Sequence, residues 1–162
     1  MMNDNKSIRE SLHLRFQQFL EANDLRQTRE RYAILDAIYD IEGIFSIEEL
    51  ADILSQSRFH VSRATLYNTT LLLVQANLLI RHPFSSGAAQ FERVNDKQPR
   101  SYQVCNNCHR ITLIKSRNLQ AALDAYHPRS FGITHRIVYV YGICGQCERT
   151  LRKKLKNKNR TT

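Results

Sequence analysis

The stretch SIEELADILSQSRFHVSRATLYNTTLLLVQANLLIRHPFSSGAAQFERV, residues 46–94, decides the fold of this chain. Its first part predicts a helix that begins at Ser46, where Glu49 three residues later completes a capping box. A longer helix, SRATLYNTTLLLVQANLL, is predicted to begin at Ser62. The helical spacing of apolar residues then ends. LLIRHPF and AQFERV are predicted to be two short strands around a Ser-Ser-Gly turn. With a helix predicted just upstream of this stretch, the order is three helices followed by a hairpin, the outline of a winged helix-turn-helix.

Two further helices are predicted upstream of this stretch. The segment TRERYAILDAIYDI has helical periodicity and begins after Thr28, a good N-cap residue. Before it, SIRESLHLRFQQFLEAND places apolar side chains on one stripe at helical spacing: Ile8, Leu12, Phe16, Phe19 and Leu20. Residues 1–93 are therefore predicted to form a winged helix-turn-helix domain.

The remaining residues predict a second, smaller domain and an α+β fold class overall. Residues 94–101, VNDKQPRS, are polar and contain Pro99, which is typical of a hinge. Residues 102–150 alternate strands (YQVC, RITLI, HRIVYVYG) with one amphipathic helix, RNLQAALDAYH. A unit of about 50 residues buries a modest fraction of its surface, so it is expected to need a metal, a partner subunit or both.

The net charge of +9 is concentrated at the end of the chain. The segment RKKLKNKNR, residues 152–160, carries six positive charges and no acid. Residues 151–162 are expected to be a disordered, solvated tail. The alternative is a flexible arm attracted to nucleic acid phosphates or to another anionic surface.

One face of the predicted helix at 62–79 is unusually polar near its beginning. Arginine, asparagine and tyrosine can contact base edges, and the amides at a helix N-terminus suit a phosphate. A plain solvated face is the alternative. The candidate DNA-binding residues on this helix are Ser62, Arg63, Thr65, Tyr67 and Asn68. Sequence-independent contacts to the DNA backbone are expected from Arg26, Arg29, Arg31, Arg81 and His82.

Four cysteines form the pattern Cx2C–x35–Cx2C: Cys105, Cys108, Cys144 and Cys147. Two such turns can close a tetrahedron of thiolates, and zinc suits a closed, sulfur-rich site with no open position. We therefore expect one structural Zn²⁺ per chain. A redox pair and an iron–sulfur cluster remain alternatives, although a thioredoxin-like centre uses a single CxxC rather than a matched pair.

Several pieces, in order, resemble the ferric uptake regulator (Fur) family of bacterial metal-responsive transcription regulators. They are LRQTRERYAILDAI, SIEELADIL, SRATLYNTTLLL, SSGAAQFE, VCNNCHRI and IVYVYGICGQC, and they cover residues 25 to 147. The resemblance implies a winged-helix DNA-binding domain, a hinge, an α/β dimerisation domain and a structural zinc site. It also implies a homodimer that binds a palindromic operator on double-stranded DNA, usually as a repressor. By position, Arg26 resembles the family's minor-groove residue, Arg31 its backbone contact and Tyr67 its base-reading tyrosine.

The chain departs from the family pattern at two places. Asn68 stands where the recognition helix commonly has arginine, which predicts an altered operator preference. The family's histidine-rich stretch before the first CxxC falls on Pro99, Arg100, Ser101 and Tyr102. Two further expected histidines fall on Ile44 and on Arg136, which is one place after His135.

Glu92 alone keeps the family's ligand type, so the usual regulatory iron site is predicted to be largely lost. Three effector hypotheses remain. The chain binds DNA constitutively once zinc is bound, or it responds to haem or to a metal in a rearranged site that uses Glu92 and His135. In the third, oxidation of the thiolates releases zinc.

An enzyme is not expected, because no H-E-x-x-H, P-loop or nucleophile elbow occurs and one closed site uses every cysteine. The competing binding hypothesis is a zinc-stapled interaction module with sequence-independent affinity for nucleic acids or proteins. The polar start MMNDNKSIRESL lacks the features of a signal peptide, and no apolar run could span a membrane. A cytoplasmic protein without a membrane partner is expected.

Overall fold

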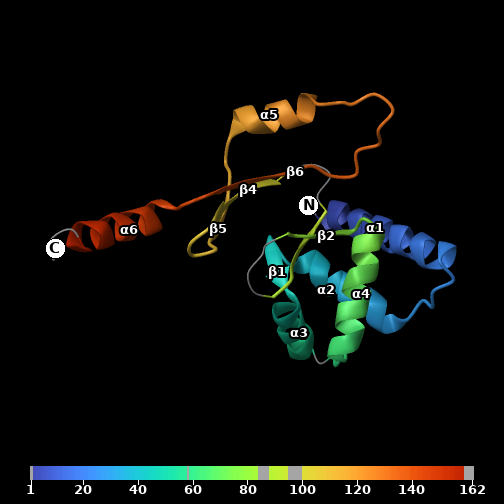
Figure 1. Ribbon diagram of the computed structural model, residues 1–162. Helices are drawn as coiled ribbons and strands as arrows, with labels where there is room; N and C mark the ends of the chain where they lie inside the picture. Colours follow the sequence, from blue (N-terminus) through green and yellow to red (C-terminus); the bar gives the residue numbers. More distant parts are fainter. Residues whose placement is uncertain (1, 58, 84–87, 95–99, 159–162) are drawn as a thin grey trace. The chain divides into compact units, whose positions relative to one another are not determined.

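The computed structural model describes residues 2–57, 59–83, 88–94 and 100–158, which divide into two units, Met1–Val94 and Asn95–Thr162 (Figure 1). The first unit contains four helices and one sheet, and the second combines a small sheet with two helices. The predicted α+β class is confirmed. None of the described helices combines the length and the apolar character needed to cross a membrane.

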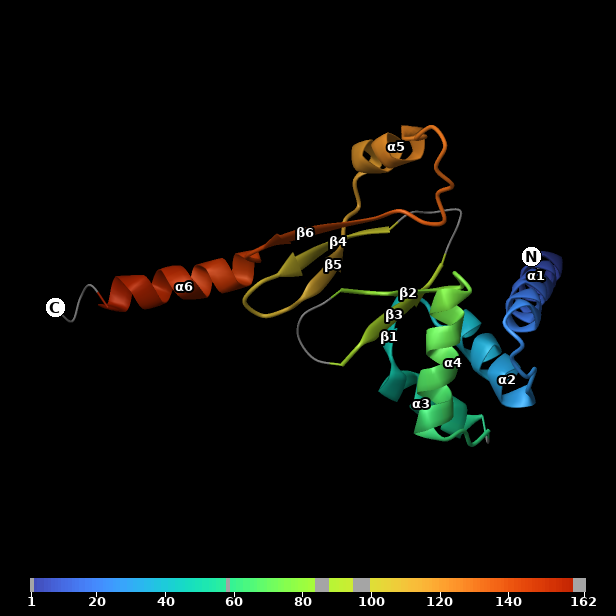
Figure 2. The same cartoon turned by 45° about the vertical axis from the view of Figure 1, so that its right-hand side comes forward.

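The first unit is a helical core with a three-stranded antiparallel sheet at its edge (Figure 2). Its helices are α1 (Met2–Ala22), α2 (Arg29–Asp40), α3 (Ile47–Gln56) and α4 (Arg63–Gln75). Its strands are β1 (Ile44–Ser46), β2 (Leu79–Arg81) and β3 (Gln90–Arg93), paired in the order β1-β3-β2. Strand β1 was not predicted. It has only three residues, between Gly43 and helix α3, which is too short to show the alternation of apolar and polar residues that indicates a strand.

Helix starts in this unit follow the predicted caps. Thr28 accepts a hydrogen bond from the backbone N–H of Arg31 at the start of α2. Ser46 and Glu49 exchange the two bonds of a capping box, from Ser46 N to Glu49 Oε2 (2.7 Å) and from Glu49 N to Ser46 Oγ (3.2 Å). These bonds satisfy amide groups that the first turn of a helix leaves unpaired.

Helix α4 ends earlier than predicted. It stops at Gln75 with Ala76 as its C-cap, and Asn77 adopts a left-handed conformation with φ of 54°. The backbone N–H of Leu78 then bonds the carbonyl of Leu73 over 2.9 Å. Asparagine tolerates this conformation, so Asn77 terminates the helix instead of continuing it.

Apolar side chains from all four helices and the sheet form the core of the first unit. The most deeply buried members are 0–2% exposed: Phe16, Leu20, Ile34, Ile38, Phe45, Leu50, Leu66, Leu73, Leu79 and Phe91. Ile8, predicted to share the α1 stripe, is 40% exposed instead.

The second unit is built on three strands in the order β5-β4-β6. Strands β4 (Arg100–Cys105) and β5 (Ile111–Leu113) are antiparallel, whereas β4 and β6 (Ile137–Gly142) are parallel. Helix α5 (Arg117–Ala125) connects β5 to β6 and has no buried residue, and α6 (Gly145–Lys158) follows β6. Among its described residues, the buried apolar side chains are Tyr102, Val104, Cys105 and Cys147.

Two predicted boundaries differ from the structure. Residues 151–158 are the later part of helix α6, so the expectation of a disordered tail from residue 151 is wrong for them. Arg100 and Ser101 belong to strand β4, so they are not part of a hinge. Residues 95–99 and 159–162 of the predicted hinge and tail, and the whole Ser-Ser-Gly turn, lie outside the described residues.

Candidate metal centre and nucleic-acid interface

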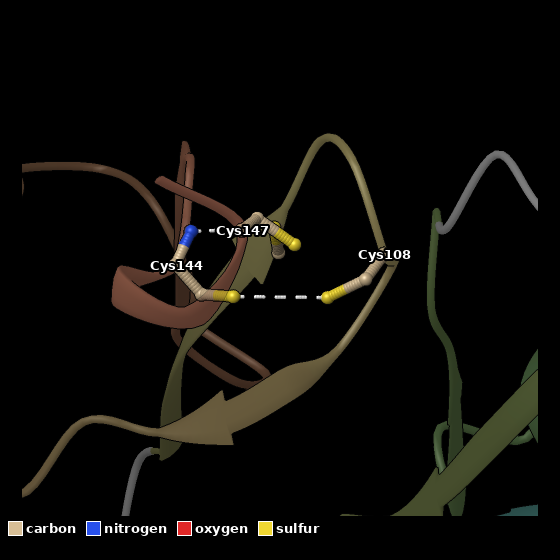
Figure 3. A group of neighbouring side chains, drawn as sticks. Cys108, Cys144 and Cys147 are labelled. Atoms are coloured by element: carbon tan, nitrogen blue, oxygen red, sulfur yellow. Dashed lines mark hydrogen bonds between the residues drawn. The ribbon is translucent and has the colours of Figure 1, made fainter. Parts of the chain in front are cut away.

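The four cysteines meet at one end of the second unit. Their sulfur atoms all lie within 4.8 Å of one another, and all four are free thiols. Figure 3 shows Cys144 and Cys108 facing each other, with their Sγ atoms 3.8 Å apart, and Cys147 beside them. Four thiolates about 2.3 Å from one tetrahedral zinc ion lie about 3.8 Å from each other, so the spacing fits such an ion.

Parallel pairing of β4 and β6 brings the two CxxC segments together. Cys105 ends β4 and stands opposite Gly142, the last residue of β6. The backbone N–H of Asn106 bonds the carbonyl of Gly142 over 2.7 Å, which ties the first turn to the second strand. Because parallel strands end at the same edge of a sheet, segments 35 residues apart in sequence become neighbours.

Different backbone geometries present the two cysteine pairs. After Cys105 the chain makes a tight turn that ends at His109, whose φ is 57°. Cys144 directly precedes α6, and Cys147 lies within the first turn of this helix. The second pair is therefore a strand-to-helix junction, which the sequence did not indicate.

N–H donors surround the sulfur atoms. Backbone N–H groups of Cys144, Cys108 and Asn107 lower the pKa of the Cys105 thiol to about 6. The backbone N–H of Cys147 lowers the pKa of Cys144. The Asn107 side chain donates to Cys147 Sγ over 3.1 Å and lowers its pKa, but burial and the neighbouring thiols outweigh it and raise that pKa to about 12. The shifts at Cys105 and Cys144 are both toward easier formation of the thiolate, the form that binds metals.

A cavity of about 220 Å³ lies between the first cysteine turn and α6. Its wall combines polar side chains, among them Asn107, Arg110, Gln146, Thr150 and Lys154, with an about equal apolar surface that includes Leu151. Arg110 donates to Gln146 Oε1 over 2.9 Å, which joins the first turn to α6. Neither the cavity nor the Asn107 contact was anticipated, because both depend on where α6 packs.

Helix α4 separates a buried face from an exposed polar face. Leu66, Thr69, Thr70 and Leu73 are buried, as the predicted periodicity requires. Ser62 accepts a 3.0 Å bond from Thr65 N and is the helix cap. The candidate base-contacting side chains, Arg63, Tyr67 and Asn68, are all exposed, and Tyr67 is 43% exposed despite its aromatic ring.

The expected backbone-contacting residues of the first unit have different environments. Arg26 and Arg81 are exposed, and Arg31 is half-buried and donates to the Arg26 carbonyl. His82 is not available to DNA, because its side chain is fully buried at 0% exposure. The expectation of a DNA contact at His82 is therefore wrong.

Glu92 lies inside the first unit next to His82. Glu92 Oε2 is 3.2 Å from His82 Nε2, and the Glu92 side chain is 2% exposed. In the sheet, Glu92 stands directly opposite Ile44 of β1 and Ile80 of β2. Strand alternation places His82 on the face that Ile80 occupies, a signal that could have revealed this pair from the sequence. His135 is an exposed residue of the second unit and contacts Thr134.

Comparison with known proteins gives one consistent family. The model of the ferric uptake regulator family matches residues 22–141. The ferric uptake regulation protein of Campylobacter jejuni is 28% identical over 138 residues, which cover 82% of this chain and 86% of that protein. The protein of the same name from Neisseria meningitidis is 28% identical over 131 residues, covering 80% and 90%.

Solved structures show the same fold. The ferric uptake regulator of Helicobacter pylori superimposes with a TM-score of 0.63 at 17% identity, covering 86% of this chain and 93% of that one. The regulator of Pseudomonas aeruginosa, solved with manganese, gives a TM-score of 0.63 at 21% identity, covering 80% and 97%. Proteins of this family are metal-responsive, DNA-binding transcription regulators that form dimers, not enzymes. With a family match across most of its length, this chain belongs to the ferric uptake regulator family.

Proposed function

We propose that this chain is a transcription regulator that binds a palindromic operator as a homodimer and represses transcription. The main observation in support of this proposal is the exposed polar face of α4. Arg63, Tyr67 and Asn68 point away from the core on a helix that follows α3 across a short turn. An exposed tyrosine between polar side chains near a helix N-terminus is suited to base edges in a major groove.

The cysteine cluster is proposed to hold a structural zinc ion. Four sulfur atoms within 4.8 Å of one another are a donor set that suits zinc. The bound ion would cross-link the end of β4 to the start of α6, while N–H donors such as Asn107 offset the charge of the thiolates. Elemental analysis is expected to find one zinc per chain that survives dialysis.

The usual regulatory iron site is proposed to be largely lost. Ile44, where the family pattern has a histidine, is the direct cross-strand neighbour of Glu92. The carboxylate lies beside His82 instead, inside the unit and almost inaccessible. An apolar neighbour in place of an imidazole leaves Glu92 with fewer of the convergent ligands that an iron site needs.

Operator binding is tested by selection from a random duplex library with the full-length, zinc-loaded protein at physiological salt. Enrichment of a palindrome is expected. Asn68→Ala should then weaken binding to that palindrome by roughly 5- to 150-fold, the effect of removing one bidentate interaction with a base. Gln75→Ala, at the other end of α4, is the matched control and should leave affinity unchanged. A library without enrichment, or equal effects of both variants, would contradict the proposal.

The effector is tested on the same operator. Affinity is measured with the zinc-loaded chain alone and after addition of iron, manganese or haem. Unchanged affinity supports constitutive binding, whereas tighter binding with one addition identifies the effector and supports a rearranged site. Oxidant sensitivity is read separately, as zinc released on exposure to peroxide.

The second candidate function is a zinc-stapled module that binds anionic partners without sequence preference. The observation in its favour is α6, which carries six basic residues and one acid. This candidate predicts equal affinity for the selected operator and for mixed-sequence duplex at every salt concentration. A preference that survives at physiological salt excludes it.

A further inference from the structure

Helix α6 presents a basic face that is separate from its contacts with the cysteine turn. Arg149, Lys153 and Lys156 are exposed and, together with Arg152, recur at helical spacing on one face. Cys147, Thr150, Leu151 and Lys154 lie on the other side, where they line the cavity beside Cys108. The helix is therefore attached on one side and uniformly cationic on the other.

Within α6 little compensates this charge. Glu148 is the one acid of the helix, and it pairs with Arg152 over 2.7 Å. Arg149, Lys153 and Lys156 stand three and four residues apart, a spacing at which like charges repel and destabilise a helix. An anionic partner along this face would remove that repulsion.

Contacts at its first turn fix α6 to the turn between β4 and β5. Asn107 donates to Cys147 Sγ, and Arg110 donates to Gln146. Figures 1 and 2 both show α6 continuing from the end of β6, away from the strands of its sheet. A helix of 14 residues is about 21 Å long, enough to present its cations to several phosphates of one duplex.

We infer that the face Arg149–Lys153–Lys156 of α6 is a second DNA-contacting surface, which binds the phosphate backbone of duplex DNA independently of sequence. The inference rests on the proposed function, because the duplex is the one that α4 is proposed to read. Lysine and arginine on a helix contribute affinity and salt dependence but no base preference. Base preference, from α4, and sequence-independent affinity for the duplex, from α6, can then be changed separately by mutation.

The test compares two triple variants that remove the same charge. Arg149→Gln/Lys153→Gln/Lys156→Gln neutralises the α6 face, and Lys115→Gln/Arg117→Gln/Arg129→Gln removes three exposed cations elsewhere in the second unit. Glutamine keeps the helix propensity of lysine and arginine. Zinc content, circular dichroism and oligomeric state are measured first to establish that both variants are folded.

Affinity is then measured against salt concentration, with the selected operator and with mixed-sequence duplex. Each phosphate that the protein no longer neutralises reduces the magnitude of the slope of log affinity against log salt by about 0.9. The slope of the α6 variant should fall by at least about 2, and that of the control by much less. The preference for operator over mixed duplex should not change in either variant.

Equal slopes for the two variants would overturn the role of α6. So would a changed oligomeric state with unchanged slopes, because α6 would then contact a second copy of the chain instead of DNA. A wild-type protein without operator preference contradicts the proposed function itself, so the two failures are distinguishable.

Discussion

Glu92 and His82 form a buried polar pair inside the sheet of the first unit, with side chains 2% and 0% exposed. Burial without a polar partner is costly, so each side chain stabilises the position of the other. The sequence identified Glu92 as a possible remnant of a ligand set. In the structure the same carboxylate sits beside His82, which sequence reasoning had placed on the DNA.

Replacing Glu92 tests whether this pair is structural. Glu92→Ala leaves a cavity and removes the polar partner of His82, so the free energy of unfolding should fall by at least about 2 kcal/mol. Denaturant unfolding of the zinc-loaded protein measures it. Glu48→Ala, an exposed carboxylate on α3, is the control and should change stability by less than about 0.5 kcal/mol. Unchanged stability together with a lost metal response would instead identify Glu92 as a ligand.

At the scale of elements, side chains that act locally were the predictable ones. Thr28 and Ser46 cap the helices that they were expected to cap, and Ser62, the predicted start of α4, is its N-cap. Such caps depend on hydrogen bonds within one turn, so the sequence carries the whole signal.

Ser46→Ala removes the acceptor for Glu49 N and half of the capping box at α3. The expected loss is about 1 kcal/mol of unfolding free energy, measured by thermal or denaturant unfolding of the first unit. Ser55→Ala removes a hydroxyl that bonds the Asp52 carbonyl on the same helix and should have a smaller effect. Equal losses would show that the capping box is not what stabilises α3.

Features that depend on contacts between residues far apart in the sequence were not predicted. Strand β1 has three residues and exists because Phe45 packs on Phe91 and pairs with it. The end of α4 was misplaced because Leu78 and Leu79 continue the apolar pattern of the helix although they belong to the turn and β2. Residues 151–158 looked like a solvated tail, but the same residues continue a helix that begins between two cysteines. The cysteine cluster was predictable from spacing alone, while its N–H donors depended on the fold.

At the scale of the whole chain, the two units have unequal cores. Among the described residues, the first unit has thirteen buried apolar side chains and the second has four, two of them cysteines. So little buried apolar surface cannot offset the entropy of ordering a chain of this length. We therefore expect the second unit to depend on a bound metal and on association with a second copy.

Removal of the metal should destabilise the second unit and leave the first unit folded. With a strong chelator, amide hydrogen exchange is expected to lose protection at β4 and β6 first, while α2 and α4 keep theirs. Readdition of zinc should restore protection, and magnesium, which prefers oxygen ligands, should not. Simultaneous loss of protection in both units would contradict independent stability of the first unit.

The second unit also leaves apolar side chains uncovered on its edge strand. Val140 and Tyr141 of β6 are 47% and 48% exposed, and α5 has no buried residue. A second copy of the chain would cover such an edge. Val140→Lys is expected to shift the sedimentation equilibrium from dimer to monomer, with Lys115→Gln as a control that leaves it unchanged. A dimer that persists in Val140→Lys would place the interface elsewhere.

The order of the two units along the chain also sets the order in which they are synthesised. Every strand and helix of the first unit precedes Val94, whereas the last cysteine arrives about 50 residues later. At ribosomal rates of about 5–20 residues per second, the first unit is complete roughly 3–10 s before the metal ligands are. The first unit can therefore fold on the nascent chain before all four cysteines have been synthesised, so we expect its folding not to depend on metal.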